Sequence, residues 1–251
     1  MTLDPREIEV FRLARDQVLA RIAEACARAG RSPDEVTLLP VSKTVPAERL
    51  AAAVAAGFAD LGENRVQEIA DKVPELPDVR WHLIGPLQSN KARRAVELCA
   101  SVQSVDSVAL GVRLDRLVRE VRGLAADGAV DPARRLPIYL QVNVDADPAK
   151  FGFEVAELPA AIDRLAACDA LETVGLMTVG RLVGSAEEAR STFAGLRELS
   201  ERLRRDRPTL GPGLSMGMSE DYPVAIEEGA TVVRVGRAIF GERPPGAAPG
   251  G

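Results

Sequence analysis

The sequence predicts a single α/β domain in which eight parallel strands, each followed by a helix, close into a (β/α)8 barrel. The chain has 251 residues, of which 46% are hydrophobic, and this suits one large domain. Short apolar runs rich in β-forming residues alternate with amphipathic helical stretches. Eight such runs can be counted, which is the number that a closed barrel requires. A doubly wound open sheet is the alternative arrangement of the same units.

A leading helix is expected before the first strand, within residues 1–30. Asp4 is a suitable N-cap, Pro5 suits the first helical position, and Gly30 provides a stop. The predicted strands are residues 36–41, 59–62, 79–85, 101–106, 137–144, 173–179, 214–218 and 231–236. Helical patterns between them cover residues 46–57, 90–100, 108–128, 157–170 and 185–205. The barrel, with its leading helix, is expected to span residues 1–243, and the Pro- and Gly-rich residues 244–251 to form a disordered tail.

Composition argues against several classes of partner. The net charge is −5, the charges are interspersed and aromatic residues make up 4% of the chain, so nucleic acid is not an expected partner. No apolar run reaches the roughly 18 residues of a membrane span, so no membrane partner is expected and the protein is predicted to be cytoplasmic. The widely spaced Cys26, Cys99 and Cys168 indicate buried thiols rather than disulfides or a metal site.

Unusual residues gather at the C-terminal ends of the predicted strands, the edge at which barrel active sites are built. They are Lys43, Gly62, Glu63, Asn64, His82, Gly85, Asp106, Asn143, Met177, Ser215 and Arg234. Lys43 is one of only four lysines among 32 basic residues. A desolvated amine at this edge can attack an aldehyde and form a Schiff base. A structural or substrate-neutralising cation is the alternative role.

Glycines near the last two predicted strands suggest a phosphate site, because backbone N–H groups at this part of a barrel bind anions. They are Gly211, Gly213, Gly217, Gly236 and Gly241, and Ser215 could add a hydroxyl donor. Tight turns alone are the other explanation. A Schiff-base lysine together with a phosphate site favours a phosphorylated aldehyde, of which pyridoxal 5′-phosphate (PLP) is the common one.

Two further side chains have open roles. Arg234 could lie beside a pyridine nitrogen and keep it unprotonated, since adjacent cations repel, or it could pair with Glu63 or Asp106. His82 is the only histidine, which excludes a His-based zinc site. It is expected either to be a satisfied imidazole in a packed strand or to contact a ligand.

Several segments resemble the pyridoxal phosphate homeostasis proteins, the YggS/PROSC type, which are similar to the N-terminal domain of alanine racemase. The matching segments are "VSKTVP", "GENRVQE", "WHLIGPLQSNK", "SVDS", "QVNVDADPAKFGF", "GLMTVG" and "LSMGMSEDYPVAIEEGATVVRVGRAIFGER". Together they cover the chain from about residue 36 to residue 243. The last segment is the most specific.

The resemblance implies a PLP barrel of fold type III, in which Lys43 carries the cofactor as a Schiff base. It also implies that Ser215, with backbone around Gly236 and Arg237, holds the phosphate, that Arg234 faces the ring nitrogen, and that Asn64 lies beside the cofactor. The chain departs from the family pattern in having Arg65 in "GENRVQE" and Arg237 where a hydroxyl side chain is common. The second departure puts one phosphate contact in doubt.

The resemblance further implies a non-catalytic role in intracellular PLP (vitamin B6) homeostasis and delivery, with apo PLP-dependent enzymes as partners. An amino-acid racemase is the alternative, but it needs a second acid/base group, which alanine racemase takes from an appended β domain. Only about 15 residues follow the last predicted strand, so no C-terminal β domain is expected, and the protein is predicted to be a monomer. A Schiff-base class I aldolase is a third possibility.

Overall fold

The computed structural model describes residues 3–125, 129–180 and 184–241, and within them eight parallel strands form one sheet. The strands are β1 Thr37–Pro40, β2 Asp60–Glu63, β3 Arg80–Leu83, β4 Cys99–Val105, β5 Leu136–Gln141, β6 Leu171–Met177, β7 Gly213–Ser215 and β8 Val232–Val235. Each predicted strand is therefore present within a few residues of its predicted position.

The sheet closes on itself. Its strand order runs from β1 through β8, β7, β6, β5, β4 and β3 to β2, with Leu39 of β1 opposite Arg234 of β8. A parallel bridge between Val41 and Gly62 joins β1 to β2, and the Ser42 N–H donates to the Gly62 carbonyl at 2.9 Å. The barrel prediction is confirmed, and the open doubly wound sheet is wrong.

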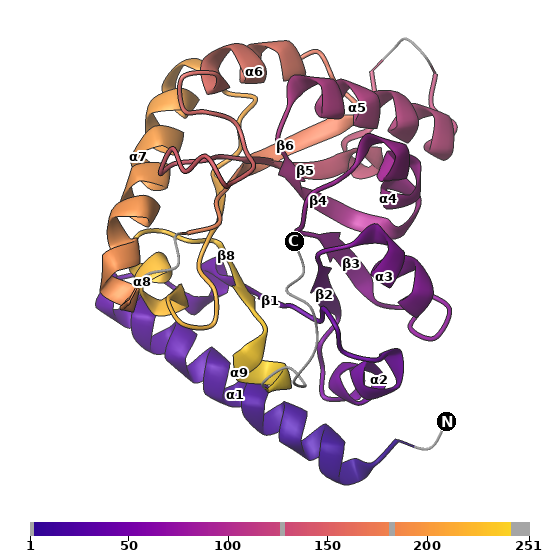
Figure 1. Cartoon of the computed structure of the whole chain (residues 1–251), viewed down its shortest axis with the longest axis vertical. Helices are drawn as coiled ribbons and strands as arrows, with labels where there is room; N and C mark the ends of the chain where they lie inside the picture. Colours follow the sequence, from indigo (N-terminus) through magenta and orange to yellow (C-terminus); the bar gives the residue numbers. More distant parts are fainter. Residues whose placement is uncertain (1–2, 126–128, 181–183, 242–251) are drawn as a thin grey trace.

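Helices surround the strands on the outside (Figure 1). They are α1 Pro5–Arg28, α2 Ala47–Ala55, α3 Val66–Lys72, α4 Ala92–Leu98, α5 Val108–Arg122, α6 Leu158–Leu165, α7 Arg190–Asp206, α8 Tyr222–Glu227 and α9 Arg237–Phe240. The main hydrophobic core lies between the barrel wall and these helices. A smaller apolar cluster of Leu39, Tyr139, Met177 and Val232 fills part of the barrel interior.

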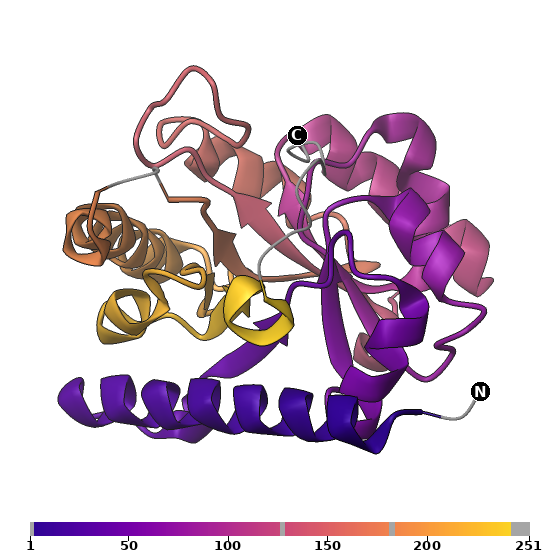
Figure 2. The same ribbon diagram turned by 60° about the horizontal axis from the view of Figure 1, so that its bottom comes forward.

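The leading helix α1 begins as predicted, because the Asp4 side chain accepts a hydrogen bond from the Arg6 N–H and Pro5 occupies the first turn. It packs against α2, α8 and α9 along the outside of the barrel (Figures 1 and 2). The Phe11 ring meets the Phe240 ring edge-on at 5.7 Å. Since α9 has only four residues, α1 supplies much of the apolar cover on this side.

Several element boundaries differ from the prediction, and the helices α3, α8 and α9 were not among the predicted patterns. The helix expected over residues 108–128 ends at Arg122, because Gly123 adopts a left-handed conformation (φ 61°) that terminates it. The helix expected to reach residue 100 ends at Leu98, and Cys99 already belongs to β4. The helix α3 was not among the named patterns, because the charged Lys72 occupies a buried position on its inner face and interrupts the apolar periodicity.

The remaining expectations concern thiols, the tail and membranes. All three cysteines are buried and unpaired, as predicted, and burial raises the pKa of the Cys99 thiol to about 12. The expected tail, residues 244–251, lies outside the described residues. Within the described part of the chain, none of the helices combines the length and the apolar character that a bilayer span requires.

Candidate functional site

The C-terminal edges of β8 and β1 come together at one side of the barrel mouth. A Cβ atom on Gly236 would lie 3.3 Å from the Val41 carbonyl oxygen, so glycine allows the two main chains to approach. The Val41 N–H also donates to the Val235 carbonyl at 2.9 Å. Val41 therefore lies against Gly236, the N-cap of α9, and Lys43 comes two residues after Val41.

Lys43 lies in a tight turn. The Val45 N–H donates to the Ser42 carbonyl at 3.0 Å, which places Lys43 and Thr44 at the two central positions of the turn. Lys43 is half-buried. Thr44 has φ 66°, a left-handed conformation that glycine favours and a β-branched residue rarely adopts. The turn that carries the candidate Schiff-base lysine is thus strained.

Arg234 is buried inside the barrel and bonded to neutral groups. Its guanidinium donates to the Ser215 hydroxyl and to the Thr178 carbonyl, both at 2.8 Å. Burial lowers its pKa to about 10, although the Asp221 carboxylate acts in the opposite direction. The expected alternative of a pair with Glu63 is wrong, because the Glu63 carboxylate receives hydrogen bonds from Lys72 and Ser42 instead.

Ser215 does not present a free hydroxyl to the mouth. It is fully buried, it donates to the Gln103 side-chain oxygen at 2.7 Å, and it accepts from Arg234. These two bonds use its donor and one acceptor site. The structure therefore places Ser215 in a polar network within the barrel rather than at its rim.

Ser219 lies where a phosphate hydroxyl contact was expected, and the sequence reasoning did not select it. Its half-buried hydroxyl accepts a hydrogen bond from the Gly236 N–H at 3.1 Å. The loop reaches this position through Gly217, whose φ is 90° and whose Cβ, if present, would lie 2.6 Å from Ala225 Cβ. The available signal was the second serine of "SMGMS", which follows β7 and precedes α8.

Asn64 and Arg237 also lie at the edge named by the sequence. Asn64 directly follows β2, and a Cβ on Gly85 would come 2.3 Å from its carbonyl oxygen, so the loop after β3 packs closely on it. The Arg237 guanidinium is half exposed and pairs with Glu220 at 3.1 Å. The main chain of Arg237, at the first turn of α9, is the part that adjoins Gly236.

His82 is a satisfied imidazole, as one of the two expectations had it. Its Nδ1 lies 2.7 Å from the Ser101 hydroxyl and its Nε2 lies 2.8 Å from an Asp60 carboxylate oxygen. Asp60 also receives a hydrogen bond from Arg80 at 2.6 Å. Burial opposes ionisation of Asp60, but the hydrogen bonds from His82 and Arg80 outweigh it and lower the pKa of this carboxyl group.

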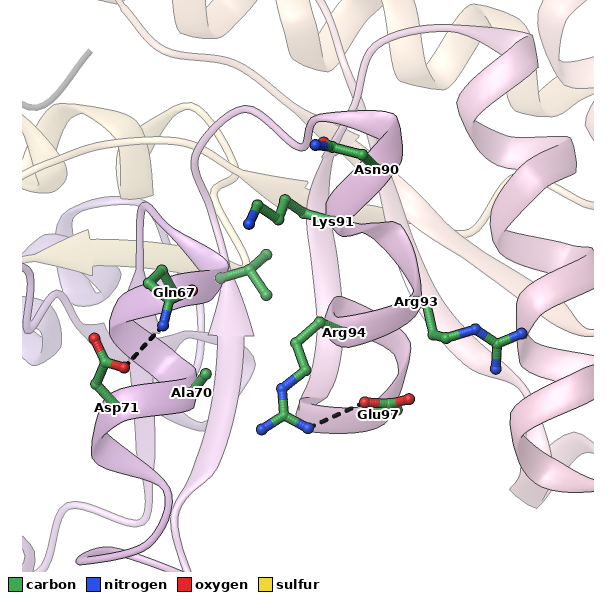
Figure 3. Close-up of a pocket in the computed structure, with 9 residues that line it drawn as sticks. Gln67, Ala70, Asp71, Asn90, Lys91, Arg93, Arg94 and Glu97 are labelled. Atoms are coloured by element: carbon green, nitrogen blue, oxygen red, sulfur yellow. Dashed lines mark hydrogen bonds and ion pairs between the residues drawn. The ribbon is translucent and has the colours of Figure 1, made fainter.

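Two other lysines, Lys150 and Lys91, differ in their surroundings. Lys150 donates to the Val179 carbonyl at 3.1 Å. Lys91 lines a cleft of about 530 Å³ between α3 and the start of α4 (Figure 3). In this cleft Arg94 pairs with Glu97 and Gln67 donates to Asp71, while Arg93 pairs with Glu120 of α5. The basic residues around Lys91 are therefore largely neutralised by neighbouring carboxylates.

The rim between β1, β7 and β8 suits a small phosphorylated aldehyde. It combines a half-buried amine with a hydroxyl, Ser219, and with the glycine main chain at Gly236. The buried cation Arg234 lies two residues before that glycine. Among the described residues no group of three or more His, Cys, Asp or Glu is arranged to hold a metal ion.

Comparison with known proteins defines the family. The family model described as alanine racemase, N-terminal domain, matches residues 14–244. A pyridoxal phosphate homeostasis protein of Pseudomonas aeruginosa is 42% identical over 233 residues, which cover 92% of this chain and 95% of the relative. The chain belongs to the family of pyridoxal phosphate homeostasis proteins. The protein of the same name in Escherichia coli is 36% identical over 239 residues, covering 90% of this chain and 94% of the relative.

Solved structures of the family agree with the fold. PipY of Synechococcus elongatus with PLP bound is 41% identical, with a TM-score of 0.74, and the match covers 88% of this chain and all of PipY. An alanine racemase of Clostridium difficile is only 11% identical, with a TM-score of 0.70, and 58% of its chain is covered. That likeness concerns the barrel fold alone.

Proposed function

We propose that this protein binds PLP at the barrel mouth as a Schiff base of Lys43 and takes part in PLP homeostasis. The observation that carries the proposal is that Val41, two residues before Lys43, lies against Gly236 across the β1–β8 junction, and that the Gly236 N–H donates to the Ser219 hydroxyl. The family relatives named for PLP homeostasis and the PipY structure with PLP bound support it.

The chemistry requires a neutral amine and a held phosphate. The Lys43 nitrogen attacks the aldehyde carbon, a C=N bond replaces the C=O bond and water leaves; hydrolysis returns the free aldehyde. In our proposal the Ser219 hydroxyl and the main-chain N–H of Arg237 bind the phosphate, and the Gly236 N–H, which donates to the Ser219 hydroxyl, holds that hydroxyl in place. Ser219 takes the part that the family resemblance gave to Ser215, because the Ser215 hydroxyl is already bonded within the barrel.

Arg234 is proposed to face the pyridine nitrogen, and Asn64 to lie beside the ring. With a pKa of about 10, Arg234 remains a cation at neutral pH. A buried cation beside the ring nitrogen disfavours its protonation, which weakens the ring as an electron sink. A weak sink suits a protein that holds the aldehyde reversibly.

We further propose that the protein does not turn over amino acids and that it delivers PLP to apo-enzymes as a cytoplasmic monomer. Racemisation needs a second acid/base group opposite the lysine. Both tyrosines of the chain are buried, and burial, with a smaller contribution from Glu172, raises the pKa of Tyr139 to about 12. The one histidine is bonded to Asp60 and Ser101. These groups are poorly suited to proton transfer at the mouth.

Reductive trapping tests the binding proposal. Purified protein incubated with PLP should develop a Schiff-base absorption band that borohydride removes, and peptide mass spectrometry should find the pyridoxyl group on Lys43. Lys43→Ala should lose the adduct completely, whereas Lys91→Ala, which changes a lysine of the outer cleft, should retain it. A pyridoxyl group on another side chain, or none in the wild-type protein, would contradict the proposal.

Stereochemical assays test the non-catalytic role. Single-enantiomer amino acids incubated with the PLP-loaded protein should keep their handedness. Sustained racemisation at ordinary enzyme turnover would instead establish the racemase alternative. A protein that takes up no PLP but cleaves a phosphorylated sugar would favour the aldolase.

A further inference from the structure

Lys72 is a buried lysine that the proposed function has not yet used. It ends α3, and its side chain is 9% exposed. Its ammonium donates to the Ser42 carbonyl at 3.1 Å and to a Glu63 carboxylate oxygen at 2.5 Å. The Ser42 carbonyl belongs to the peptide group that joins Ser42 to Lys43. A buried cation is therefore bonded directly to the main chain of the candidate Schiff-base lysine.

Glu63 completes the contact from β2. Its side chain is fully buried, and the same oxygen that binds Lys72 accepts the Ser42 hydroxyl at 2.7 Å. Burial raises the pKa of Glu63, although Lys72 and the Ser42 hydroxyl act in the opposite direction. Ser42 is thus held through both its carbonyl and its hydroxyl.

Glu68 holds the other side of Lys43. It lies one helical turn before Lys72 on α3, and its carboxylate accepts the Thr44 N–H at 3.0 Å. The same carboxylate oxygen lies 3.7 Å from the Lys72 ammonium. The residues before and after Lys43 are therefore both attached to one set of three charged side chains.

The strain at Thr44 shows what these attachments resist. A non-glycine residue with positive φ persists only where the surrounding structure holds it in place. A buried ion pair is by itself a weak source of stability, because desolvation of the two charges offsets their attraction. The ion pair between Glu63 and Lys72 is therefore better explained by where it holds Ser42 than by the stability it adds.

We propose that Glu63, Glu68 and Lys72 form a clamp, which holds the main chain of Lys43 in the geometry that Schiff-base formation requires. The three are positioning residues, since they act through Ser42 and Thr44. This inference rests on the proposed function, because it assigns a geometric requirement to the same lysine.

The double variant Glu63→Gln/Lys72→Met tests the clamp. Lys72→Met alone would leave the Glu63 charge buried without its partner and would destabilise the barrel. In the double variant the introduced amide oxygen can still accept the Ser42 hydroxyl, and the introduced thioether side chain keeps most of the buried volume. The double variant removes both charges of the ion pair, the ammonium's hydrogen bond to the Ser42 carbonyl and its contact with Glu68. Lys91→Met is the matched control, because it removes a lysine that lies outside the clamp.

The readouts are the thermal unfolding of the apo-protein and the dissociation constants for PLP and for pyridoxal, which lacks the phosphate. If the double variant folds, its dissociation constants for PLP and for pyridoxal should both rise by the same factor, on the order of tenfold or more. The factor is the same because the clamp positions the Lys43 amine, which both aldehydes use, and not the phosphate site. Lys91→Met should match the wild type. Ser219→Ala should weaken PLP but not pyridoxal.

Two results would overturn the clamp. A folded double variant whose dissociation constants lie within about twofold of those of Lys91→Met would show that Lys43 needs no positioning. A loss of affinity for PLP with unchanged affinity for pyridoxal would show that the clamp acts on phosphate binding. Absence of the Schiff-base band from the wild-type protein would overturn the proposed function as well, so the two failures can be told apart.

Discussion

Polar clusters at the two ends of the neighbouring strands β1 to β4 differ in how completely they are satisfied. His82 was expected at the C-terminal edge, but its ring is bonded to Asp60, the first residue of β2; both of its ring nitrogens have partners, and Asp60 is bonded from two sides. At the mouth, the second carboxylate oxygen of Glu63 is buried without a hydrogen-bond partner among the described residues, and Thr44 is strained. The first cluster is closed, whereas the second retains unfavourable features.

The difference follows from what each end does in a barrel. The N-terminal face contributes to stability, and the C-terminal face carries the chemistry. A group that only stabilises the fold can use all of its hydrogen bonds on its neighbours. A group that positions Lys43 is restricted to a geometry that suits the lysine. Backbone strain at Thr44 and the Glu63 carboxylate oxygen that lacks a partner in the described part of the chain are consequences of that restriction. Mutations at the two ends should consequently separate stability from ligand affinity.

The largest effect on stability is expected from His82→Ala. The change removes the ring that links Asp60 to Ser101, so the Ser101 hydroxyl and one Asp60 carboxylate oxygen lose this partner while Arg80 still donates to the other oxygen; the free energy of unfolding should fall by about 2–3 kcal/mol. Urea denaturation would measure the loss. The dissociation constant for PLP should stay within about twofold of the wild-type value. A large loss of PLP affinity with unchanged stability would break the distinction between the two ends.

The two serines near β7 sharpen the comparison within the mouth itself. Ser215→Ala should lower the free energy of unfolding by about 1–3 kcal/mol, because Arg234 and Gln103 each lose a buried partner. Ser219→Ala should change stability by less than about 0.5 kcal/mol but weaken PLP binding about tenfold, through one lost hydrogen bond to a charged phosphate. Urea denaturation and PLP titration of both variants would measure this. The reverse pattern would return the phosphate contact to Ser215.

The smallest expected effect is the pH dependence at Asp60. Its pKa is lowered in the folded protein, so its contribution to stability is present above the ordinary aspartate pKa of about 3.9 and is lost as pH falls through the folded value. Asp60→Asn should therefore cost about 1 kcal/mol near neutral pH and progressively less below about pH 4. Urea midpoints measured from pH 7 down to pH 3 would test this. A difference that grows on acidification would contradict the assignment.

Most of the fold could be predicted from the sequence because its signals are local. Most strands are short apolar runs, and α1 begins at an N-cap and a proline that the sequence displays. The errors occur where a single residue interrupts the pattern of apolar and helix-forming residues. Gly123 ends α5 early through a left-handed conformation, and Lys72 hides α3 by placing a charge on its buried face.

The candidate site could be predicted in part. Lys43, Asn64, Arg234, Gly236 and Arg237 all lie at or near the predicted strand ends, because β-strand register and barrel closure bring these ends to one rim. Ser215 was a reasonable choice by the same rule. Ser219 could not be chosen over it, since which of two serines in one loop meets Gly236 depends on how Gly217 turns the chain.

The sequence by itself determined the barrel, the succession of strands and helices along the chain, and the lysine on which the proposed chemistry depends, because periodicity and turn residues act over a few positions. Only the tertiary structure decided which groups satisfy one another. Lys72 lies 30 residues from the Ser42 carbonyl that it binds, and Ser215 lies 112 residues from its partner Gln103. Such pairings depend on barrel closure and on the burial of charge, and neither can be read from neighbouring residues.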